Sequence, residues 1–463
     1  MELHILFKVV MSLGVLGFLG VFLRLYHALV VTPNRLGSLL RKQGINGPPQ
    51  KLLLGNILEI KRSISEAVAK AATNGSPAFH ECEAHVFPFL ESWRKQYGDV
   101  YMFALGNTQT LSVTDPDTVR EIIKCTSLDL GKPSRETKEF GALLGQGIIT
   151  SSATLVDTWE SIIENQGGIA DIKVDQHLRC FAGDVISRAC FVATFPGIKR
   201  FSRGSKLSKK AGWALEKELR KLILKVVKER NEVGDENDLL QTLLDGAKNG
   251  NLSQDSIERF VVHNCKNIYL AAETTGLTAS WCLMLLASNQ EWQDRVRAEA
   301  LQVCKGQIPN VDMVLKLKQD SFGKFKEEHC PLNRPFPILT AREALEDIKF
   351  GGITVPKGVD VWIVVTRLHT DPEIWGPDAY KFNPERFASG VTGACKQPHM
   401  YMPFGFGPRV CPGQNLALAE LKVLIAVIVA KFSFSLSPKY MHKPSLNLNT
   451  QPGNGVDLLV KKL

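Results

Sequence analysis

A glycine-rich segment that ends in a single cysteine constrains the fold of this chain more than any other sequence feature. The segment reads PFGFGPRVCPGQN over residues 403–415, and an apolar run that predicts a helix continues from Asn415 to Ala430. A cysteine just before a helix favours the thiolate, because the helix dipole and free backbone N–H groups lower the pKa of its thiol. Such a sulfur can ligate iron, and glycines let a flat cofactor approach the backbone closely. We therefore predict that Cys411 is a metal ligand and that Arg409 pairs with a carboxylate of the cofactor.

A second segment with chemical groups lies on a helix predicted from about Ser256 to Ser288. It reads LAAETT over residues 270–275, with small residues before a carboxylate and a hydroxyl. The hydroxyl of Thr274 can orient water while Glu273 connects to bulk solvent, which is an arrangement suited to proton delivery. The alternative is structural, because helical threonines often bond back to the carbonyl four residues earlier. The cysteine segment favours the catalytic interpretation.

The N-terminal residues predict a membrane-spanning helix. From Ile5 to Leu23 only Lys8 is charged, and this apolar length is enough to cross a bilayer. Four basic residues follow the run: Arg24, Arg35, Arg41 and Lys42. The positive side of an anchor stays cytosolic, so the rest of the chain is expected in a reducing compartment. The alternative is a cleaved signal peptide, but the run is longer than usual and no small-x-small cleavage site follows it. We expect a retained anchor over residues 1–43 and a proline-rich hinge over residues 44–56.

The composition excludes several classes of protein. Of the 463 residues 44% are hydrophobic and 22% are charged, which excludes a disordered or collagen-like chain. The formal charge of +9 is spread over the chain, so it favours an anionic membrane surface or an acidic partner over nucleic acid. Ten cysteines without a C-x-x-C pair argue against a disulfide scaffold, a zinc ribbon and a thioredoxin-like site.

The rest of the chain predicts a mainly helical protein with a smaller β-rich part. Residues 100–114 read as two strands with a turn at Gly106-Asn107, and Asp115-Pro116 opens a helix. Helical periodicity dominates residues 176–290, in which the basic stretch 199–230 is most simply a solvated helix face. The last third mixes proline-rich turns with short strands, at residues 351–355 and 359–365.

Together with several other motifs, these segments resemble the cytochrome P-450 family. Cys411 matches the axial haem thiolate of that family, and FNPERF at residues 382–387 resembles its P-E-R-F meander. TAREA at residues 340–344 resembles the strand whose arginine binds a haem propionate, and DLLQ at residues 238–241 resembles the segment before the long central helix. The segments YMPFGFGPRVCPGQNLALAELKV and EALEDIKFGGITVPKGV look closest to a plant microsomal subfamily that oxidises gibberellins and related terpenoids.

The resemblance implies a cytochrome P-450 fold with an N-terminal transmembrane helix and a haem-binding catalytic domain over residues 57–463. It implies that Cys411 ligates the iron of haem b, and that Glu273 and Thr274 deliver protons. It implies further contacts with the haem, which come from Arg342, Arg409, Phe404, Gly405 and Gly413. It implies contacts with a small apolar substrate, which come from Pro337, Ile338 and Leu339.

The implied reaction is monooxygenation of a terpenoid, and a gibberellin-type diterpenoid fits the subfamily. One oxygen atom of O2 would enter a C–H or C=C bond and the other would leave as water. Electrons would come from NADPH through a membrane-bound NADPH–cytochrome P-450 reductase. The expected location is the endoplasmic reticulum membrane, with a single span and a cytosolic catalytic domain.

Two departures from the family pattern concern the proton-delivery helix and the meander. The family usually reads A-G-x-E/D-T-T, and this chain is one residue short before Glu273, which corresponds to about 100° of helix rotation. Either Ala272 takes the place of the family's glycine, or the groove that this helix opens over the iron has a different geometry. The family also places an E-x-x-R helix before the meander, yet no E-x-x-R occurs between Ala271 and Pro384. We therefore expect the buried Arg386 to lack its usual partners, which is strongly destabilising.

A third departure concerns the family's W-x-x-x-R helix, whose Trp and Arg contact a haem propionate. Here Trp159 is followed at the fourth position by Ile163, and residues 156–174 do not resemble that helix. A block of the family pattern is also missing around residues 196–211. We predict weakened haem affinity, with Arg342 and Arg409 as the remaining propionate anchors.

These departures keep other function classes open. One is a catalytically inactive, haem-poor relative or an aberrant splice form, which the missing helices favour. Another is a reductase-independent isomerase or dehydratase of the P-450 type, against which the Glu273-Thr274 pair argues. A structural zinc at Cys411 is a more distant alternative, because no second Cys or His stands at ligand spacing.

Overall fold

The computed structural model divides into two compact units. The first comprises residues 1–134, 337–374 and 399–410, and the second comprises residues 135–336, 375–398 and 411–463. The structure describes residues 2–74, 87–125, 141–191, 209–233, 239–249, 253–305, 313, 316–317, 324, 339–405, 407, 410–447 and 449–463. Pro337, Ile338 and Arg409, three of the expected site residues, lie outside this range.

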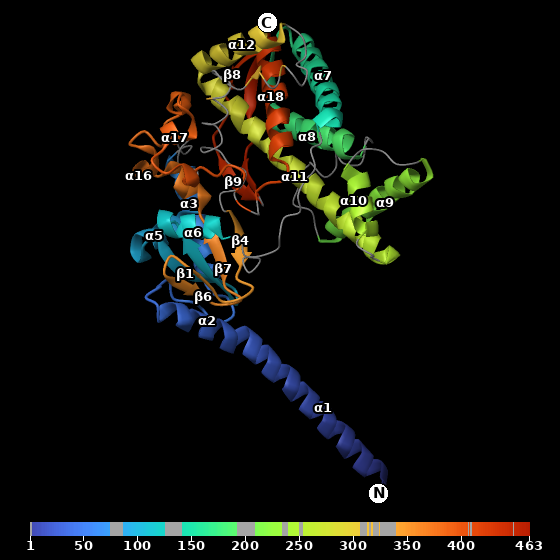
Figure 1. Ribbon diagram of the computed structural model, residues 1–463, viewed down its shortest axis with the longest axis vertical. Helices are drawn as coiled ribbons and strands as arrows, with labels where there is room; N and C mark the ends of the chain where they lie inside the picture. The colour runs from blue at the N-terminus through green and yellow to red at the C-terminus, as the bar shows by residue number, and fades with distance from the viewer. Residues whose placement is uncertain are drawn as a thin grey trace. The chain divides into compact units, whose positions relative to one another are not determined.

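The first unit begins with a long helical rod. Helix α1 (Glu2–Tyr26), a π-helical turn (His27–Val31) and α2 (Thr32–Arg41) follow one another without a break, as Figure 1 shows in blue. The part from Met11 onward is long and apolar enough to span a bilayer, and large apolar side chains from Met11 to Tyr26 are exposed. Helix α11 (Gln254–Ser288) passes the same test of length and composition, but it is mostly buried and is a core helix. The expected N-terminal apolar helix is therefore present.

The first unit is built on a four-stranded sheet of order β1-β2-β7-β4. Strands β1 (Val100–Leu105) and β2 (Thr108–Val113) form the predicted hairpin, β2 pairs in parallel with β7 (Asp360–Ile363), and β7 pairs antiparallel with β4 (Leu339–Glu343). The other elements of this unit are α3 (Ile57–Asn74), α5 (Pro88–Tyr97), α6 (Pro116–Lys124), β5 (Ile348–Phe350), β6 (Ile353–Val355) and α15 (Val365–Thr370).

Local sequence signals explain how these elements begin and end. Asp115 caps α6, because its carboxylate accepts a hydrogen bond from the N–H of Thr118 at 2.8 Å. The strand expected over residues 351–355 is partly wrong, because Gly351 and Gly352 have positive φ and form the turn between β5 and β6. Aromatic side chains pack α5 against β1, and the cluster consists of Phe87, Phe89, Leu90, Trp93, Tyr101, Phe103 and Val364.

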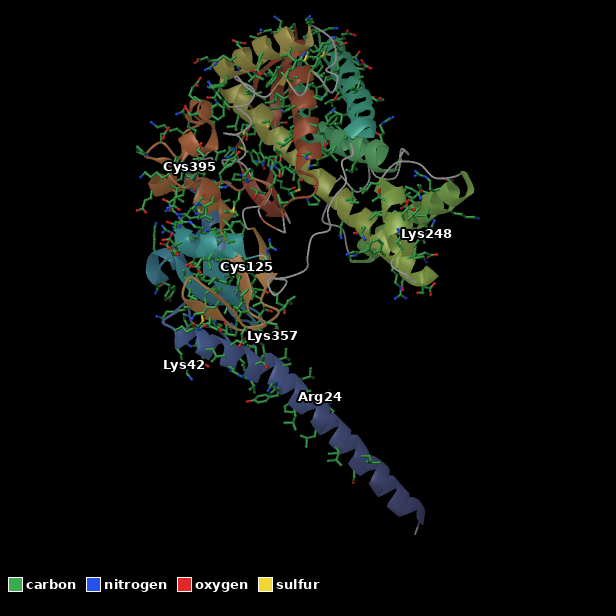
Figure 2. All side chains as sticks on the ribbon, viewed as in Figure 1. Arg24, Lys42, Cys125, Lys248, Lys357 and Cys395 are labelled. Carbon is green, nitrogen blue, oxygen red and sulfur yellow. The ribbon has the colours of Figure 1, made fainter. Side chains whose placement is uncertain are left out.

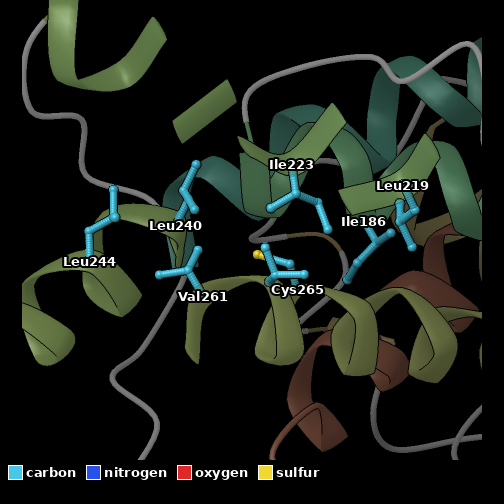
Figure 3. Close-up of a cluster of buried hydrophobic side chains, with 8 residues drawn as sticks. Ile186, Leu219, Ile223, Leu240, Leu244, Val261 and Cys265 are labelled. Carbon is cyan, nitrogen blue, oxygen red and sulfur yellow. The ribbon is translucent and has the colours of Figure 1, made fainter. Parts of the chain in front are cut away.

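The second unit is predominantly helical and is organised around α11. Its other long helices are α7 (Gly141–Asn165), α8 (Val174–Phe191), α9 (Lys209–Val233), α10 (Leu239–Asn249), α12 (Gln290–Cys304) and α18 (Gln414–Lys431). Figure 3 shows buried side chains from α8, α9, α10 and α11 meeting in one cluster, among them Ile186, Ile223, Leu240 and Cys265. Burial of this apolar surface stabilises the packing of the four helices.

A small antiparallel sheet joins distant parts of the second unit. Its order is β3-β11-β8, from β3 (Ile169–Lys173), β11 (Asp457–Lys462) and β8 (Phe432–Leu436). A two-stranded ribbon of β9 (Pro444–Asn447) and β10 (Asn449–Pro452) precedes β11 in the chain. Short elements complete the unit: the turn at Pro384–Phe387 and α17 (Gly390–Ala394).

Glu420 on α18 makes the stability of this chain depend on pH. Its side chain is 3% exposed and its Oε1 atom has no hydrogen-bond partner among the described residues. Burial raises the pKa of this carboxyl well above its usual value. The unfolded chain therefore releases the proton at lower pH than the native chain, so native stability falls as pH rises above the unfolded pKa.

We expect Glu420→Gln to remove this loss of stability at neutral pH. The variant should have a higher melting temperature than the wild type at pH 7, and the difference should shrink towards pH 4. Burial of an unsatisfied polar group costs about 1–3 kcal/mol, which sets the scale of the effect. Thermal unfolding of the full chain in detergent across this pH range measures it, and a difference that does not vary with pH would contradict the explanation.

Candidate haem-thiolate site

The cysteine segment forms a sequence of tight turns that leads into α18. Gly405 and Gly407 adopt φ values of 75° and 59°, in the left-handed region that glycine adopts without steric cost. The N–H of Gly405 donates to the carbonyl of Met402 at 3.1 Å, and the N–H of Val410 donates to that of Gly407 at 3.1 Å. A Cβ atom on Gly407 would come within 3.2 Å of the Ile123 carbonyl oxygen. The turns therefore require small residues where the sequence has glycine.

Cys411 is a free and exposed cysteine at the end of these turns. Helix α18 begins three residues later at Gln414, whose N–H donates to the Cys411 carbonyl rather than to the sulfur. Neighbouring protein atoms desolvate the thiol and raise its pKa, and a backbone hydrogen bond with Gly413 opposes this rise. The expectation of a lowered pKa is therefore wrong for the free thiol, because desolvation exceeds the effect of the backbone N–H groups.

The other expected cofactor residues lie in both units. Arg342 is half-buried on β4 opposite Val361, next to an irregularity in the pairing of β4 with β7. Phe404 and Gly405 are half-buried and belong to the first unit with Arg342, whereas Gly413 belongs to the second unit with Cys411. Leu339, the described member of the expected substrate contacts, opens β4 opposite Ile363.

Glu273 and Thr274 lie at the point where α11 crosses α8. The carboxylate of Glu273 accepts a hydrogen bond from Arg179 of α8 at 2.8 Å in an ion pair. Arg179 is 8% exposed and also donates to Gln451 Oε1 of β10 at 3.0 Å. The crossing is close, because a Cβ atom on Gly276 would come within 2.8 Å of the Leu178 carbonyl oxygen. The structure thus holds the carboxylate of Glu273 in one orientation.

Arg179 and Gln451 are contacts that the sequence analysis missed. Arg179 stands on a helix whose neighbouring positions are apolar and buried, including Leu178 and Phe181. A single arginine in such a setting requires an acceptor, because burial of an unpaired charge is costly. That requirement is a signal in the sequence, but it does not identify which of the chain's acidic residues is the partner.

The backbone of α11 is a continuous α-helix through Ala272, the residue before Glu273.

The expectation that the charge of Arg386 is unpaired is wrong, because Asp378 takes the place of the partners that the family pattern supplies. Its side chain is 7% exposed and pairs with Asp378 at 3.2 Å. The same guanidinium donates to the carbonyl oxygens of Asp378 at 2.8 Å and Lys381 at 3.1 Å. Its neighbour Glu385 forms ion pairs with Arg295 of α12 and with Lys324. Acceptors just before the meander therefore bind the two terminal nitrogens of this guanidinium without an E-x-x-R helix.

Trp159 belongs to the core of the second unit. It lies on α7 with 0% exposure, and its ring centroid is 5.7 Å from that of Phe432 and 6.3 Å from that of His177. This setting agrees with the absence of a W-x-x-x-R motif at this position. The tryptophan stabilises the packing of α7 on α8 and on the small sheet.

A family model for cytochrome P450 matches residues 187–457, which include α11, the meander, the cysteine segment and α18. The chain belongs to the cytochrome P450 family. It is 40% identical to cytochrome P450 714C2 of Oryza sativa subsp. japonica over 505 aligned positions, which cover 96% of each chain. It is 37% identical to cytochrome P450 714A2 of Arabidopsis thaliana, over 96% of this chain and 97% of the relative.

The length of the alignment bears on the departures from the P450 pattern. The alignment with cytochrome P450 714C2 is 505 positions long, whereas this chain has 463 residues. The relative therefore contains residues without counterparts here. A relative that is longer within the aligned region agrees with the expectation that segments are missing from this chain.

Membership of the P450 family makes this chain an enzyme of the monooxygenase class with a haem-thiolate cofactor. The cysteine segment fits such a group. Cys411 offers a free and exposed thiol, and Gly413, two residues later, carries no β-carbon that would lie against its sulfur. The ligand is a soft thiolate donor of the kind that iron in this class of site requires.

Proposed function

We propose that this P450 is a membrane-anchored monooxygenase that hydroxylates or epoxidises a terpenoid. The observation that carries the proposal is Cys411 before α18, together with a carboxylate and hydroxyl pair on α11. The substrate that fits the subfamily resemblance best is a gibberellin-type diterpenoid. Relatives that are 34–40% identical over more than nine-tenths of this chain support the subfamily, although their names do not specify a substrate.

Several residues would hold the haem. Cys411 would supply the axial thiolate, and iron binding would release the thiol proton whose loss is disfavoured in the free chain. Arg342 and Arg409 would donate hydrogen bonds to the propionates. Phe404, Gly405 and Gly413 would lie against the macrocycle. When bound, the group supplies the chemistry that places one atom of O2 in the substrate and releases the other as water.

Residues of α11 would transfer protons from solvent to the reaction site. Glu273 is half-buried, so its carboxylate can exchange protons with solvent while Arg179 fixes one of its oxygens. Thr274, the next residue, would present its hydroxyl to water on the substrate side and pass the proton on. Pro337, Ile338 and Leu339 would provide the apolar contacts that orient a terpenoid skeleton.

The N-terminal rod would anchor the enzyme in the endoplasmic reticulum membrane with its catalytic part in the cytosol. Basic residues follow the apolar helix, in agreement with a cytosolic orientation. In that location NADPH–cytochrome P450 reductase would supply the electrons. The net charge of +9 suits an acidic electron donor, because opposite charges accelerate association.

Turnover by microsomes that contain the full chain tests the proposed function. A panel of gibberellin-type and other diterpenoids is incubated with and without NADPH and reductase, and products are identified by mass spectrometry. We expect a product heavier by one oxygen atom that requires both additions. Isomerised or dehydrated product without NADPH would instead support the reductase-independent alternative.

An inactive, haem-poor relative is the second candidate function. The observation that favours it is the loss of the E-x-x-R and W-x-x-x-R helices, which removes one arginine that would anchor a propionate. We expect less than one haem per chain after purification without added haem, and a rise when haem is supplied. The pyridine haemochrome assay measures this ratio, and full occupancy without supplementation would show that the lost segments are dispensable.

Replacing Glu273 by glutamine tests its role in proton transfer. The amide keeps the shape and can still accept a hydrogen bond from Arg179, but it cannot carry a proton. We expect turnover to fall about 10²-fold, with haem content unchanged. Glu291→Gln, at an exposed position on α12, serves as the matched control. Equal turnover in the two variants would remove Glu273 from the mechanism.

A further inference from the structure

One face of α12 contacts the meander that precedes the cysteine segment. The ring centroid of Trp292 lies 6.4 Å from that of Phe382 in the meander, with the ring planes at 81° to each other. Cζ of Arg295, three residues later on α12, lies 4.0 Å from the centroid of the Trp292 ring. Aromatic rings attract each other in this edge-to-face arrangement, and a cation is attracted to the face of tryptophan. Trp292 therefore contacts an aromatic side chain of the meander and a cation of its own helix.

Glu385 is a second point of contact between the meander and α12. Its carboxylate forms an ion pair with Arg295 through one oxygen, and Nζ of Lys324 lies 2.8 Å from the other. Hydrogen bonds from Lys324 and Arg295 lower the pKa of this carboxyl. Lys324 comes from the interval between α12 and β4, where the family pattern places its E-x-x-R helix. Phe382 and Glu385 thus connect the meander to the same short stretch of α12.

A different face of α12 holds the end of α18. Nε of Arg297 donates to the Val429 carbonyl at 2.8 Å, and its Nη2 donates to the Phe432 carbonyl at 3.2 Å. The buried side chain of Gln293 exchanges hydrogen bonds with the backbone of Phe434, at 2.8 and 3.1 Å. A cationic side chain suits this position, because the last carbonyls of a helix lack partners within the helix and carry partial negative charge.

Helix α18 extends this support to the cysteine. The helix begins at Gln414, three residues after Cys411, and continues without a break to Lys431. Residues 420–429 are buried, so the helix is packed along its length and moves as one element. Cys395, labelled in Figure 2 at the end of α17, lies in the stretch that joins the meander to the cysteine. Within the second unit, α12 therefore contacts both the segment before Cys411 and the helix after it.

We propose that Trp292 and Arg295 are positioning residues that give the meander the support which the E-x-x-R helix gives it in the family pattern. The inference rests on the proposed haem-thiolate function. The two residues act through Phe382 and Glu385, and they keep the meander and α18 on one helix so that Cys411 is held in place. The Arg295 side chain is 35% exposed, so its ion pair alone contributes little. Trp292 contributes more, because its ring makes two of the contacts.

Carbon monoxide difference spectra of full-length variants in membranes test the proposal. Trp292→Ala removes the ring that contacts Phe382 and Arg295. We expect the ratio of the shorter-wavelength inactive form to the red-shifted form to rise about fivefold. Trp292→Phe keeps a ring at this position and should restore most of the wild-type ratio. Tyr440→Ala is the matched control, because Tyr440 is a half-buried aromatic residue of the same unit that contacts Met284 and His442. The control should keep the wild-type ratio.

A double variant distinguishes this positioning role from a general loss of stability. Glu385→Gln removes the charge that Arg295 and Lys324 bind, and it should raise the ratio less than Trp292→Ala does. Both changes disrupt the same support, so the double variant should have the ratio of Trp292→Ala alone. Independent losses of stability would instead multiply the two increases.

The outcomes separate failure of the inference from failure of the proposed function. A wild-type ratio in Trp292→Ala, or an equal rise in Tyr440→Ala, would leave the haem-thiolate function intact and overturn the positioning role. Multiplied increases in the double variant would overturn it as well. Absence of the red-shifted band from the wild-type chain would overturn the haem-thiolate function and the inference with it.

Discussion

Replacing Cys411 by serine is expected to abolish the strongly red-shifted Soret band of the reduced, carbon monoxide-bound chain. That band requires a thiolate opposite carbon monoxide, and a serine hydroxyl neither ionises at neutral pH nor binds iron as a soft donor. The change is nearly isosteric, so the turns at Gly405 and Gly407 should persist. The effect is a complete loss of the band rather than a partial decrease. The difference between the spectra of reduced membranes with and without carbon monoxide, recorded on membranes that contain the full chain, measures it.

Cys180→Ser is the matched control for this experiment. Cys180 is also free and exposed, but it lies on α8. Its replacement should leave the band unchanged. A red-shifted band in the Cys411→Ser variant would mean that another sulfur ligates the iron. If the wild-type chain itself gives no band, or only the shorter-wavelength inactive form, the monooxygenase assignment for this chain fails and the haem-poor alternative replaces it.

Replacing Trp159 by alanine is expected to destabilise the second unit by about 3–5 kcal/mol. The ring is fully buried among Phe432, His177 and neighbouring apolar residues, so its removal leaves a large cavity. Trp159→Phe should cost much less. It keeps most of the apolar ring, and the indole N–H has no hydrogen-bond acceptor among the described residues, so its loss breaks no hydrogen bond.

Denaturant unfolding of the detergent-solubilised full chain measures both tryptophan variants. The free energy of unfolding should decrease in the order wild type, Trp159→Phe, Trp159→Ala, with the larger step at the second replacement. Nearly equal losses for the two variants would mean that the indole edge, rather than the buried volume, carries the stabilisation. Wild-type stability for Trp159→Ala would contradict the placement of α7 in the core.

The sequence predicted the helices and turns whose signals are local. Helix α11 and helix α18 follow from long apolar patterns, the β1-β2 hairpin follows from Gly106-Asn107, and the start of α6 follows from Asp115-Pro116. The prediction that Cys411 is a ligand is local in the same way, because it combines a cysteine among glycines with the start of a helix. In each case the information lies within a few residues.

Contacts between distant residues could not be predicted in the same way. The partner of Glu273 is Arg179, which lies 94 residues earlier in the chain. Asp378 satisfies Arg386 from only eight residues away, but the segment between them has no regular periodicity that would place the two side chains together. The pKa of Cys411 depends on the atoms that surround the sulfur in three dimensions. The sequence indicates the helix dipole, which lowers this pKa, but it does not indicate the desolvation that raises it.

The order of strands β3, β11 and β8 has a consequence for synthesis of the protein. The central strand, β11, is made last of the three, and the contact of Val456 with Asp175 next to it spans 281 residues. At typical elongation rates this separation corresponds to about 15–60 s between the appearance of the two partners on the ribosome. During that interval β3 has no neighbour in its sheet. The second unit can therefore complete this sheet only after most of its helices have been translated. Chaperones that bind an unpaired strand edge would act on this chain before that point.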